Sequence, residues 1–153
     1  MAVKLSKHFT LKEAITSQTA TRLGIDNTPN EIQIQKIGFV SNFILEPPRE
    51  YFKKSFSPSS WFRCIDLCTA IGSSAKSQHA KAEAVDFEIP GVDNLDLAIW
   101  MTENVKFDQL ILEYYEPGVP DSGWVHCSYA SSYHNRGEIL TYSGGIYTPG
   151  LPV

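Results

Sequence analysis

The sequence predicts an α+β fold, because helical patterns come first along the chain and strand patterns dominate later. The helical signal is an apolar stripe at helical spacing between residues 34 and 45, and the strand signals are short β-rich segments that begin at residue 84. The length of 153 residues fits a single domain, residues 1–153, with a sizeable core. The sequence contains no internal repeat and no low-complexity linker.

The N-terminal part is expected to form two helices. Thr10 can cap a helix that begins at Leu11, with Glu13 at the capping-box position. The small polar residues 16–21 are expected to end that helix or to form a loop. After a turn signal at residues 26–29, a second helix should follow, because the chain then carries an apolar stripe. The stripe consists of Ile34, Ile37, Val40, Ser41, Ile44 and Leu45.

The middle of the chain is expected to be less regular. Pro47 and Pro48 should kink or end the second helix, because proline lacks the backbone N–H and clashes with the preceding turn. Residues 55–63 are interpreted as an extended segment or short strand. Residues 65–71 are interpreted as a helical turn, which Gly72 breaks.

Most of the predicted strands lie in the second half of the chain. Residue types that favour strands, bounded by turn signals, mark them. The predicted strands are residues 84–89, 107–115, 124–129 and, within a tail of turns, 139–142. One helix is expected among them, capped by Asn94 and running from Leu95 to about Glu103.

The composition argues against several classes of function. The net charge of -4 argues against nucleic acid as a partner, because phosphate binding depends on lysine and arginine. No apolar run approaches the ~20 residues of a membrane span, and the N-terminus lacks the apolar stretch of a signal peptide. We therefore expect synthesis in the cytoplasm. The cysteines Cys64, Cys68 and Cys127 are expected to be reduced, small apolar residues rather than ligands of a sulfur-rich zinc site.

Three residues carry the chemistry: His79, Asp86 and His126. Two imidazoles and one carboxylate make a three-ligand zinc shell that leaves a fourth position for water, which is the arrangement of a catalytic site. Zinc lowers the pKa of such a water towards neutrality and so prepares it to attack a carbonyl group. On the predicted strands, alternation places Asp86 on a polar face and His126 on the face it shares with Trp124. Each of the three residues taken alone also fits an ordinary, satisfied polar side chain.

Residues 77–86, 107–113 and 124–128 resemble, in order, three motifs of the zinc D-alanyl-D-alanine carboxypeptidases and phage endolysin peptidases. In the small phage and prophage branch of that family these motifs read Ser-x-His-x-x-Gly-x-Ala-x-Asp, Phe-Asp-Gln-Leu-Ile-x-Glu and Trp-Val-His-x-Ser. Shorter segments also resemble the branch, so that the resemblance covers nearly the whole chain. They are residues 9–13, 27–29, 45–50 and 135–138.

The family shares its fold with the Hedgehog signalling domain. The resemblance therefore implies N-terminal helices packed on a small, mainly antiparallel sheet that carries the zinc site. It also implies one Zn²⁺ per chain, held by His79, Asp86 and His126.

The chain departs from the family's pattern at several positions. Residues 60–64 replace the motif Ser-Gly-Tyr-Arg-Ser, Cys68 replaces an asparagine, Ala82 replaces a glycine, and Ser73 replaces the second glycine of a pair. The three metal ligands and Arg63 are retained. The departures therefore bear on substrate fit and loop geometry rather than on the metal.

The general base must take a proton from water and give it to the leaving amine. Better-studied relatives place an acid three residues before the last histidine, and that position is Gly123 here. We assign the role to Glu113, the acid of the Phe-Asp-Gln-Leu-Ile-x-Glu motif, with Asp121 and Glu116 as rivals. The alternative for Glu113 is an ordinary carboxylate at the end of a strand.

Three further residues are expected at the substrate. Arg63 would bind a substrate carboxylate or polarise the scissile carbonyl through its forked donors, with a surface ion pair as the alternative. Ser77 would hydrogen-bond the substrate or brace the His79 loop. Trp124 is expected to line the cleft or to pack at its rim.

These residues and the resemblance predict a monomeric, zinc-dependent peptidase that hydrolyses stem peptides of bacterial peptidoglycan, as a phage or prophage endolysin. Such an enzyme would accumulate in the host cytoplasm and reach the cell wall with a release partner such as a holin. The alternative is a catalytically silent, zinc-binding member of the family that serves as a cell-wall-binding or virion structural module. The sequence leaves open whether the enzyme is a carboxypeptidase or an endopeptidase.

Overall fold

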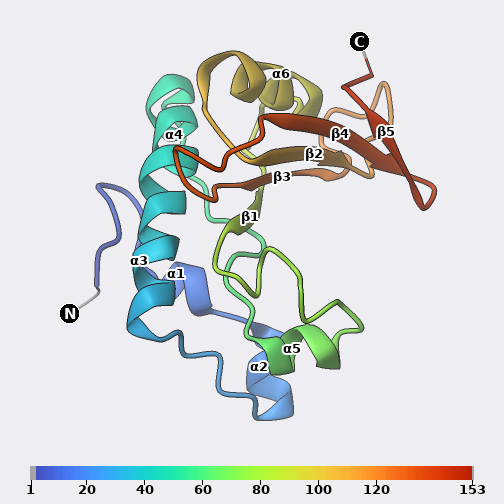
Figure 1. The fold of residues 1–153 in the computed structure, drawn as a ribbon. Helices are drawn as coiled ribbons and strands as arrows, with labels where there is room; N and C mark the ends of the chain where they lie inside the picture. The colour runs from blue at the N-terminus through green and yellow to red at the C-terminus, as the bar shows by residue number, and fades with distance from the viewer. Residues whose placement is uncertain (1–2, 153) are drawn as a thin grey trace.

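The computed structural model describes residues 3–152 and confirms the α+β class (Figure 1). The helices are α1 (Leu11–Ile15), α2 (Gln18–Leu23), α3 (Glu31–Val40), the π-helical η1 (Ser41–Leu45), α4 (Glu46–Phe52), α5 (Ile65–Ala70) and α6 (Asn94–Asn104). The strands are β1 (Ala84–Phe87), β2 (Gln109–Glu113), β3 (Trp124–Ser128), β4 (Glu138–Ser143) and β5 (Ile146–Pro149). They form a sheet of order β1-β3-β2-β4-β5, antiparallel except for the parallel pair β2–β4. Among the residues that the structure describes, no helix is long and apolar enough to cross a membrane.

The N-terminal helices follow the sequence prediction in part. The capping box at α1 is confirmed, because the Thr10 hydroxyl accepts from the Glu13 N–H and the Glu13 carboxylate accepts from the Thr10 N–H. The prediction for residues 16–21 was incomplete, because the Ser17 hydroxyl accepts from the Ala20 N–H and so begins α2.

Of the two outcomes predicted for Pro47 and Pro48, a kink or an end of the second helix, the end does not occur. Helices α3, η1 and α4 run on as one long column through to Phe52 (Figure 1). The π-helical η1 widens the turn just before the prolines, and these lie in the first turn of α4, where a proline is tolerated because its N–H is not needed.

The sheet separates the core from a polar face. The side chains on one face of β1, β2 and β3 pack in the core, which also contains residues of α3 and α6, and they are inaccessible to solvent. They are Val85, Phe87, Leu110, Leu112, Val125 and Cys127. Because side chains alternate along a strand, Asp86, His126 and Glu113 lie on the opposite face.

Helix α6 is capped by Asp93 rather than by Asn94, so the prediction missed the cap by one residue. The Asp93 carboxylate accepts from the Leu95 N–H. Asn94 is buried, and its amide donates to the main-chain oxygens of Ser122 and Gly123. These bonds fix the loop that leads into β3.

The C-terminal tail contains more regular structure than the sequence predicts. Residues 139–142 lie within β4 as expected, but β5 was missed because Gly144, Gly145 and Pro149 read as turn residues. The two glycines make the tight turn of a β-hairpin with φ angles of 59° and 78°. In this way β4 and β5 extend the sheet beyond β2 (Figure 1).

Candidate metal centre

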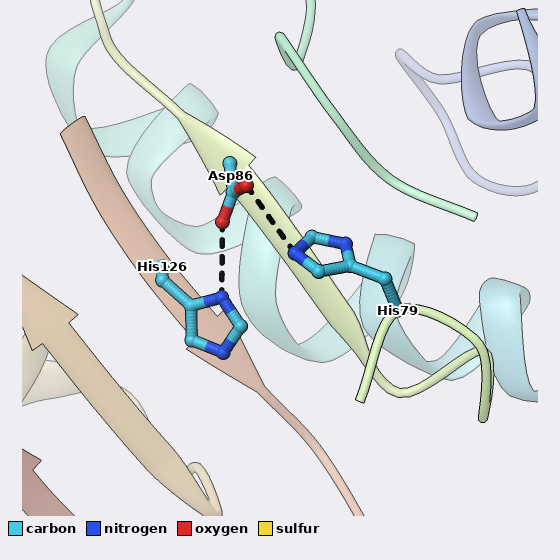
Figure 2. Close-up of side chains that lie close together, drawn as sticks. All are labelled: His79, Asp86 and His126. Atoms are coloured by element: carbon cyan, nitrogen blue, oxygen red, sulfur yellow. Dashed lines mark hydrogen bonds and ion pairs between the residues drawn. The ribbon is translucent and has the colours of Figure 1, made fainter. Parts of the chain in front are cut away.

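His79, Asp86 and His126 come together on the polar face of the sheet (Figure 2). The pairing of β1 with β3 sets Asp86 directly opposite His126. His79 reaches in from the loop before β1. Oδ1 of Asp86 lies 3.0 Å from Nδ1 of His126, and Oδ2 lies 3.2 Å from Nε2 of His79. All three residues are buried.

Hydrogen bonds within the loop and to Arg63 hold the loop that carries His79. The Ser77 hydroxyl accepts from the His79 N–H, and the His79 carbonyl accepts from the N–H groups of Arg63 and Ala82. Ala82 has a φ of 61°, the left-handed region that glycine adopts most easily. Ala82, which stands where the family pattern has a glycine, therefore holds a strained backbone conformation.

The tautomer of His79 is fixed by its far nitrogen. Nδ1 lies 2.7 Å from the carbonyl oxygen of Trp61, which can only accept, so this nitrogen carries the proton. The lone pair of His79 is therefore on Nε2, the atom that faces Asp86. A metal-binding histidine is oriented in the same way by a partner on its second nitrogen.

The tautomer of His126 is fixed by a chain of hydrogen bonds. The Asp108 carboxylate accepts from Nε2 of Gln78 at 3.2 Å, which turns the Gln78 oxygen towards His126. That oxygen lies 2.8 Å from Nε2 of His126 and can only accept, so Nε2 carries the proton. The lone pair of His126 is therefore on Nδ1 and also faces Asp86.

Arg136 completes this chain. Its Nε and Nη2 each donate to one oxygen of Asp108 at 2.9 Å. The hydrogen bonds from Arg136 lower the pKa of Asp108 and outweigh the effect of burial, so that the carboxylate is ionised and acts as an acceptor. This chain of hydrogen bonds, which runs from Arg136 through Asp108 and Gln78 to His126, thus sets which nitrogen of the neutral His126 ring carries the lone pair.

The centre holds two imidazole lone pairs and one carboxylate, an arrangement that fits a zinc ion. Burial by itself raises the pKa of Asp86, but hydrogen bonds and positive charge from protonated His126 and His79 outweigh it and hold the pKa well below its usual range. A zinc ion would take the place of those protons. Acceptor atoms that converge in this way repel one another unless a cation lies between them. Two ligand atoms of a tetrahedral zinc lie roughly 3.3 Å apart, close to the two separations found here.

Glu113 lies beside this cluster on the same face. It is half-buried and directly paired with Trp124, two residues before His126. Burial raises the pKa of Glu113 and Asp86 adds to the rise, whereas His126 and Arg63 oppose it. The indole N–H of Trp124 is buried without a hydrogen bond of ordinary geometry, although it is near enough to Glu113 to lower that pKa slightly.

Gly123 has no room for a side chain. A Cβ at this position would lie 2.0 Å from the main-chain oxygen of Glu113, and the glycine has a φ of 64°. An acid at position 123 would therefore collide with the end of β2. The two rivals to Glu113 are Glu116 and Asp121, and both are exposed in the loop between β2 and β3.

Arg63 reaches the cluster from the extended segment before α5. Its Nη2 lies 3.7 Å from Oδ2 of Asp86, and its Nε is buried without a hydrogen-bond partner in the described part of the chain. The guanidinium is thus held beside the cluster, with its Nε–H enclosed by the protein. Ser77, by contrast, uses its hydroxyl to brace the His79 loop.

Sequence reasoning missed the residues that orient the two histidines. Gln78 directly precedes His79, and Asp108 lies within the Phe-Asp-Gln-Leu-Ile-x-Glu motif, so both stood beside residues that were singled out. The partner of His79 is the main-chain carbonyl of Trp61, and a main-chain contact of this kind cannot be predicted from residue type. The three cysteines are free thiols, of which Cys68 and Cys127 are buried and Cys64 is partly exposed, and the clusters able to hold a metal among residues 3–152 contain none of them.

A family model described as Peptidase M15 matches residues 7–128. The chain belongs to the Peptidase M15 family. This membership supports a metallopeptidase, and peptidases of this family depend on zinc. No curated protein and no solved structure matches the chain. Strands β4 and β5 lie beyond the residues that the family model covers.

Proposed function

We propose that the chain is a zinc peptidase that hydrolyses stem peptides of bacterial peptidoglycan, with His79, Asp86 and His126 as ligands of one zinc ion. One observation carries the metal assignment. The far nitrogens of both histidines are committed to acceptors, so that Nε2 of His79 and Nδ1 of His126 are the nitrogens left to bind a cation beside the Asp86 carboxylate. A bound zinc would supply Lewis acidity to a peptide carbonyl and to a water molecule.

Glu113 is the residue best placed to move the proton. It shares the face of the sheet with the cluster, and its side chain is half-buried, whereas Glu116 and Asp121 are exposed in a loop. A carboxylate in this position takes the proton of water and returns it to the leaving amine. The main chain of Glu113 also fills the space that a side chain at position 123 would need.

Arg63 is the candidate to hold a carboxylate of the substrate. Its guanidinium lies beside Asp86 and has an unpaired N–H, and a forked donor binds a carboxylate through two parallel bonds. A cavity of about 620 Å³ opens next to it, lined by residues 57–63 together with residues of α1, α2 and α5. Its size suits a short peptide.

The context of an endolysin extends this proposal. The family and the sequence motifs support peptidoglycan as the substrate, and a phage or prophage lysis enzyme released by a holin fits those motifs. The alternative, a silent wall-binding or virion structural module, is distinguished by the proton-moving acid, because a silent member needs none.

The deciding experiment incubates the purified chain with isolated sacculi, with and without a chelator, and identifies the released muropeptides by mass spectrometry. We expect release that stops with the chelator and returns with zinc. The masses would assign the cut bond and separate a carboxypeptidase from an endopeptidase. Release that ignores the chelator would refute the zinc mechanism. Sacculi that stay intact while the chain binds them would favour the silent module.

A further inference from the structure

A row of paired side chains crosses the face of the sheet that carries the metal cluster. Trp124 of β3 is paired with Glu113 of β2, and Glu113 is paired with Tyr142 of β4. Tyr142 is in turn paired with Tyr147 of β5. Directly paired residues point to the same side of a sheet, so the row runs from the edge of the metal cluster to the outermost strand.

The aromatic rings of this row are in contact, and two of the residues are exposed while Trp124 and Tyr142 are half-buried. The rings of Tyr142 and Tyr147 lie 4.5 Å apart. Tyr114, which follows Glu113, joins them with its ring 5.2 Å from Trp124 and 5.3 Å from Tyr142. Tyr114 is 51% exposed and Tyr147 is 57% exposed. Tyr114 also holds a φ of 56°, a strained conformation of the kind that gathers at binding sites.

Charge is distributed unevenly along this face. Arg63 lies at the β1 end, next to Asp86, where a carboxylate of a peptide would be bound. At the other end, residues 142–149 contain no charged side chain. The aromatic end therefore offers rings and phenol hydroxyls to an uncharged ligand, whereas the arginine end offers a cation to an acidic one.

These features fit a sugar ring. A pyranose presents a face of C–H groups that packs flat on an aromatic ring, and its rim of hydroxyl and acetamido groups hydrogen-bonds to phenols. In peptidoglycan the stem peptide is joined to the glycan through an amide, so the sugar at the junction carries no free carboxylate. A peptide cut at the metal cluster thus brings an uncharged glycan strand onto the neighbouring surface.

We propose that Trp124, Tyr114, Tyr142 and Tyr147 form a glycan-binding surface for N-acetylated hexosamine rings. The surface rests on the proposed function, because it places the stem peptide at the metal cluster and the strand that bears the peptide along β4 and β5. The substrate then lies across the sheet, with its carboxylates towards Arg63 and its sugars towards Tyr147. Two of the four aromatic residues belong to the hairpin beyond the matched residues.

The test is binding of a peptide-free sugar, chitotetraose, to the metal-free chain, measured by titration calorimetry and by NMR shifts. We expect binding that Tyr147→Ala weakens about tenfold, the effect of losing one aromatic contact. Tyr147→Phe should retain most of it, because the stacking face remains. The matched control is Tyr51→Ala on α4, an exposed tyrosine stacked on Trp100, which should bind as wild type.

A second measurement places the sugar in the reaction. The ratio of cleavage rates on sacculi and on glycan-free stem peptide should fall in Tyr147→Ala and stay constant in Tyr51→Ala. The absence of chitotetraose binding, or an equal loss on both substrates, would overturn the glycan surface, the latter by showing that the row contacts peptide. A chain that binds the sugar and cleaves neither substrate would leave the surface standing and refute the peptidase instead.

Discussion

Two clusters of histidine and carboxylate residues in this molecule look alike in composition and differ in the hydrogen-bond partners that surround them. The first is His79, Asp86 and His126 on the sheet, and the second is His8, Glu46 and Glu50 at the start of α4. The Asp86 side chain is 11% exposed, whereas that of Glu50 is 58% exposed. Both groups bring ligand atoms of the right kind close together.

In the surface cluster, the Glu46 carboxylate is already satisfied by hydrogen-bond donors of the protein. Oε1 of Glu46 lies 2.7 Å from Nδ1 of His8, and Oε2 accepts from the His8 N–H and from the Ser6 hydroxyl. These bonds tie the N-terminal segment to α4 without a cation. In the sheet cluster the far nitrogen of each histidine has an acceptor, the Trp61 carbonyl for His79 and the Gln78 oxygen for His126, which leaves the facing nitrogens for a cation. The partners of the histidine nitrogens, rather than the residue types, therefore favour the sheet cluster as the candidate metal site.

The largest effect is expected from removing the central carboxylate. Asp86→Ala should reduce zinc from one ion per chain to almost none, because three protein ligands are the minimum for such a site. The matched control is Glu46→Gln, which should keep its zinc. Metal content is measured by mass spectrometry of the dialysed proteins. Full occupancy in Asp86→Ala, or a second zinc lost from Glu46→Gln, would break the comparison.

The next effect separates holding the metal from moving the proton. Glu113→Gln should retain zinc and lose roughly 10²-fold or more in the cleavage rate, the usual scale of general acid–base catalysis. Glu116→Gln and Asp121→Asn are the controls on the neighbouring loop, and single-turnover rates on a soluble stem peptide compare all three. Near-normal rates in Glu113→Gln together with a collapse in either control would transfer the role to the loop.

A smaller effect tests the tautomer argument itself. Gln78→Leu removes the acceptor that holds the proton on Nε2 of His126, so zinc affinity should fall roughly 10–100-fold while the fold persists. Competition with a zinc indicator measures the affinity, and Gln35→Leu on the exposed side of α3 is the control. Unchanged affinity in Gln78→Leu would show that the lone pair of His126 is oriented without Gln78.

The smallest effect concerns the surface clamp. Glu46→Gln should destabilise the fold by about 2 kcal/mol at neutral pH, the scale of one hydrogen bond to a charged group. Burial raises the pKa of Glu46, but the bonds from His8 and Ser6 outweigh it and lower the pKa below 4.5. A lowered pKa gives stability that is present at neutral pH and lost in acid. The difference from wild type in urea unfolding should therefore shrink as the pH falls below that value; a constant difference would contradict the clamp.

Much of the fold follows from local sequence signals. The capping box of Thr10 and Glu13 is visible in four consecutive residues. The strands at residues 84–89, 107–115 and 124–129 are marked by their own residue types and by the turn residues beside them. The structure confirms the capping box and these strands. The continuation of the helix through Pro47 could not be predicted, because it depends on a π-helical turn that has no clear sequence signature. β5 was missed because its pairing with β4 outweighs the turn preference of its residues.

The candidate site, like the fold, could be predicted in part. His79, Asp86 and His126 stand in short motifs, and the structure brings them together as a cluster that could hold a metal; their role as ligands stays a prediction. Gln78 and the carbonyl of Trp61 escaped, because an orienting hydrogen bond depends on where a loop runs and not on residue type. Pairing of the predicted strands allowed Glu113 to be placed beside His126, but no distance between the two side chains could be inferred from the sequence.

The place of β1 at the edge of the sheet has a consequence for local opening. β1 is paired with β3 on one side, and on its other side it meets Ser60 at a single isolated bridge to Asp86. All four residues of β1 are buried, so its amides exchange with solvent only when the strand opens in a sub-global unfolding event. A cation shared by Asp86 and His126 would join this strand to its inner neighbour, and it binds only while the strand is closed. Metal occupancy would then slow hydrogen exchange in β1 by a factor that reports the metal's free energy of binding.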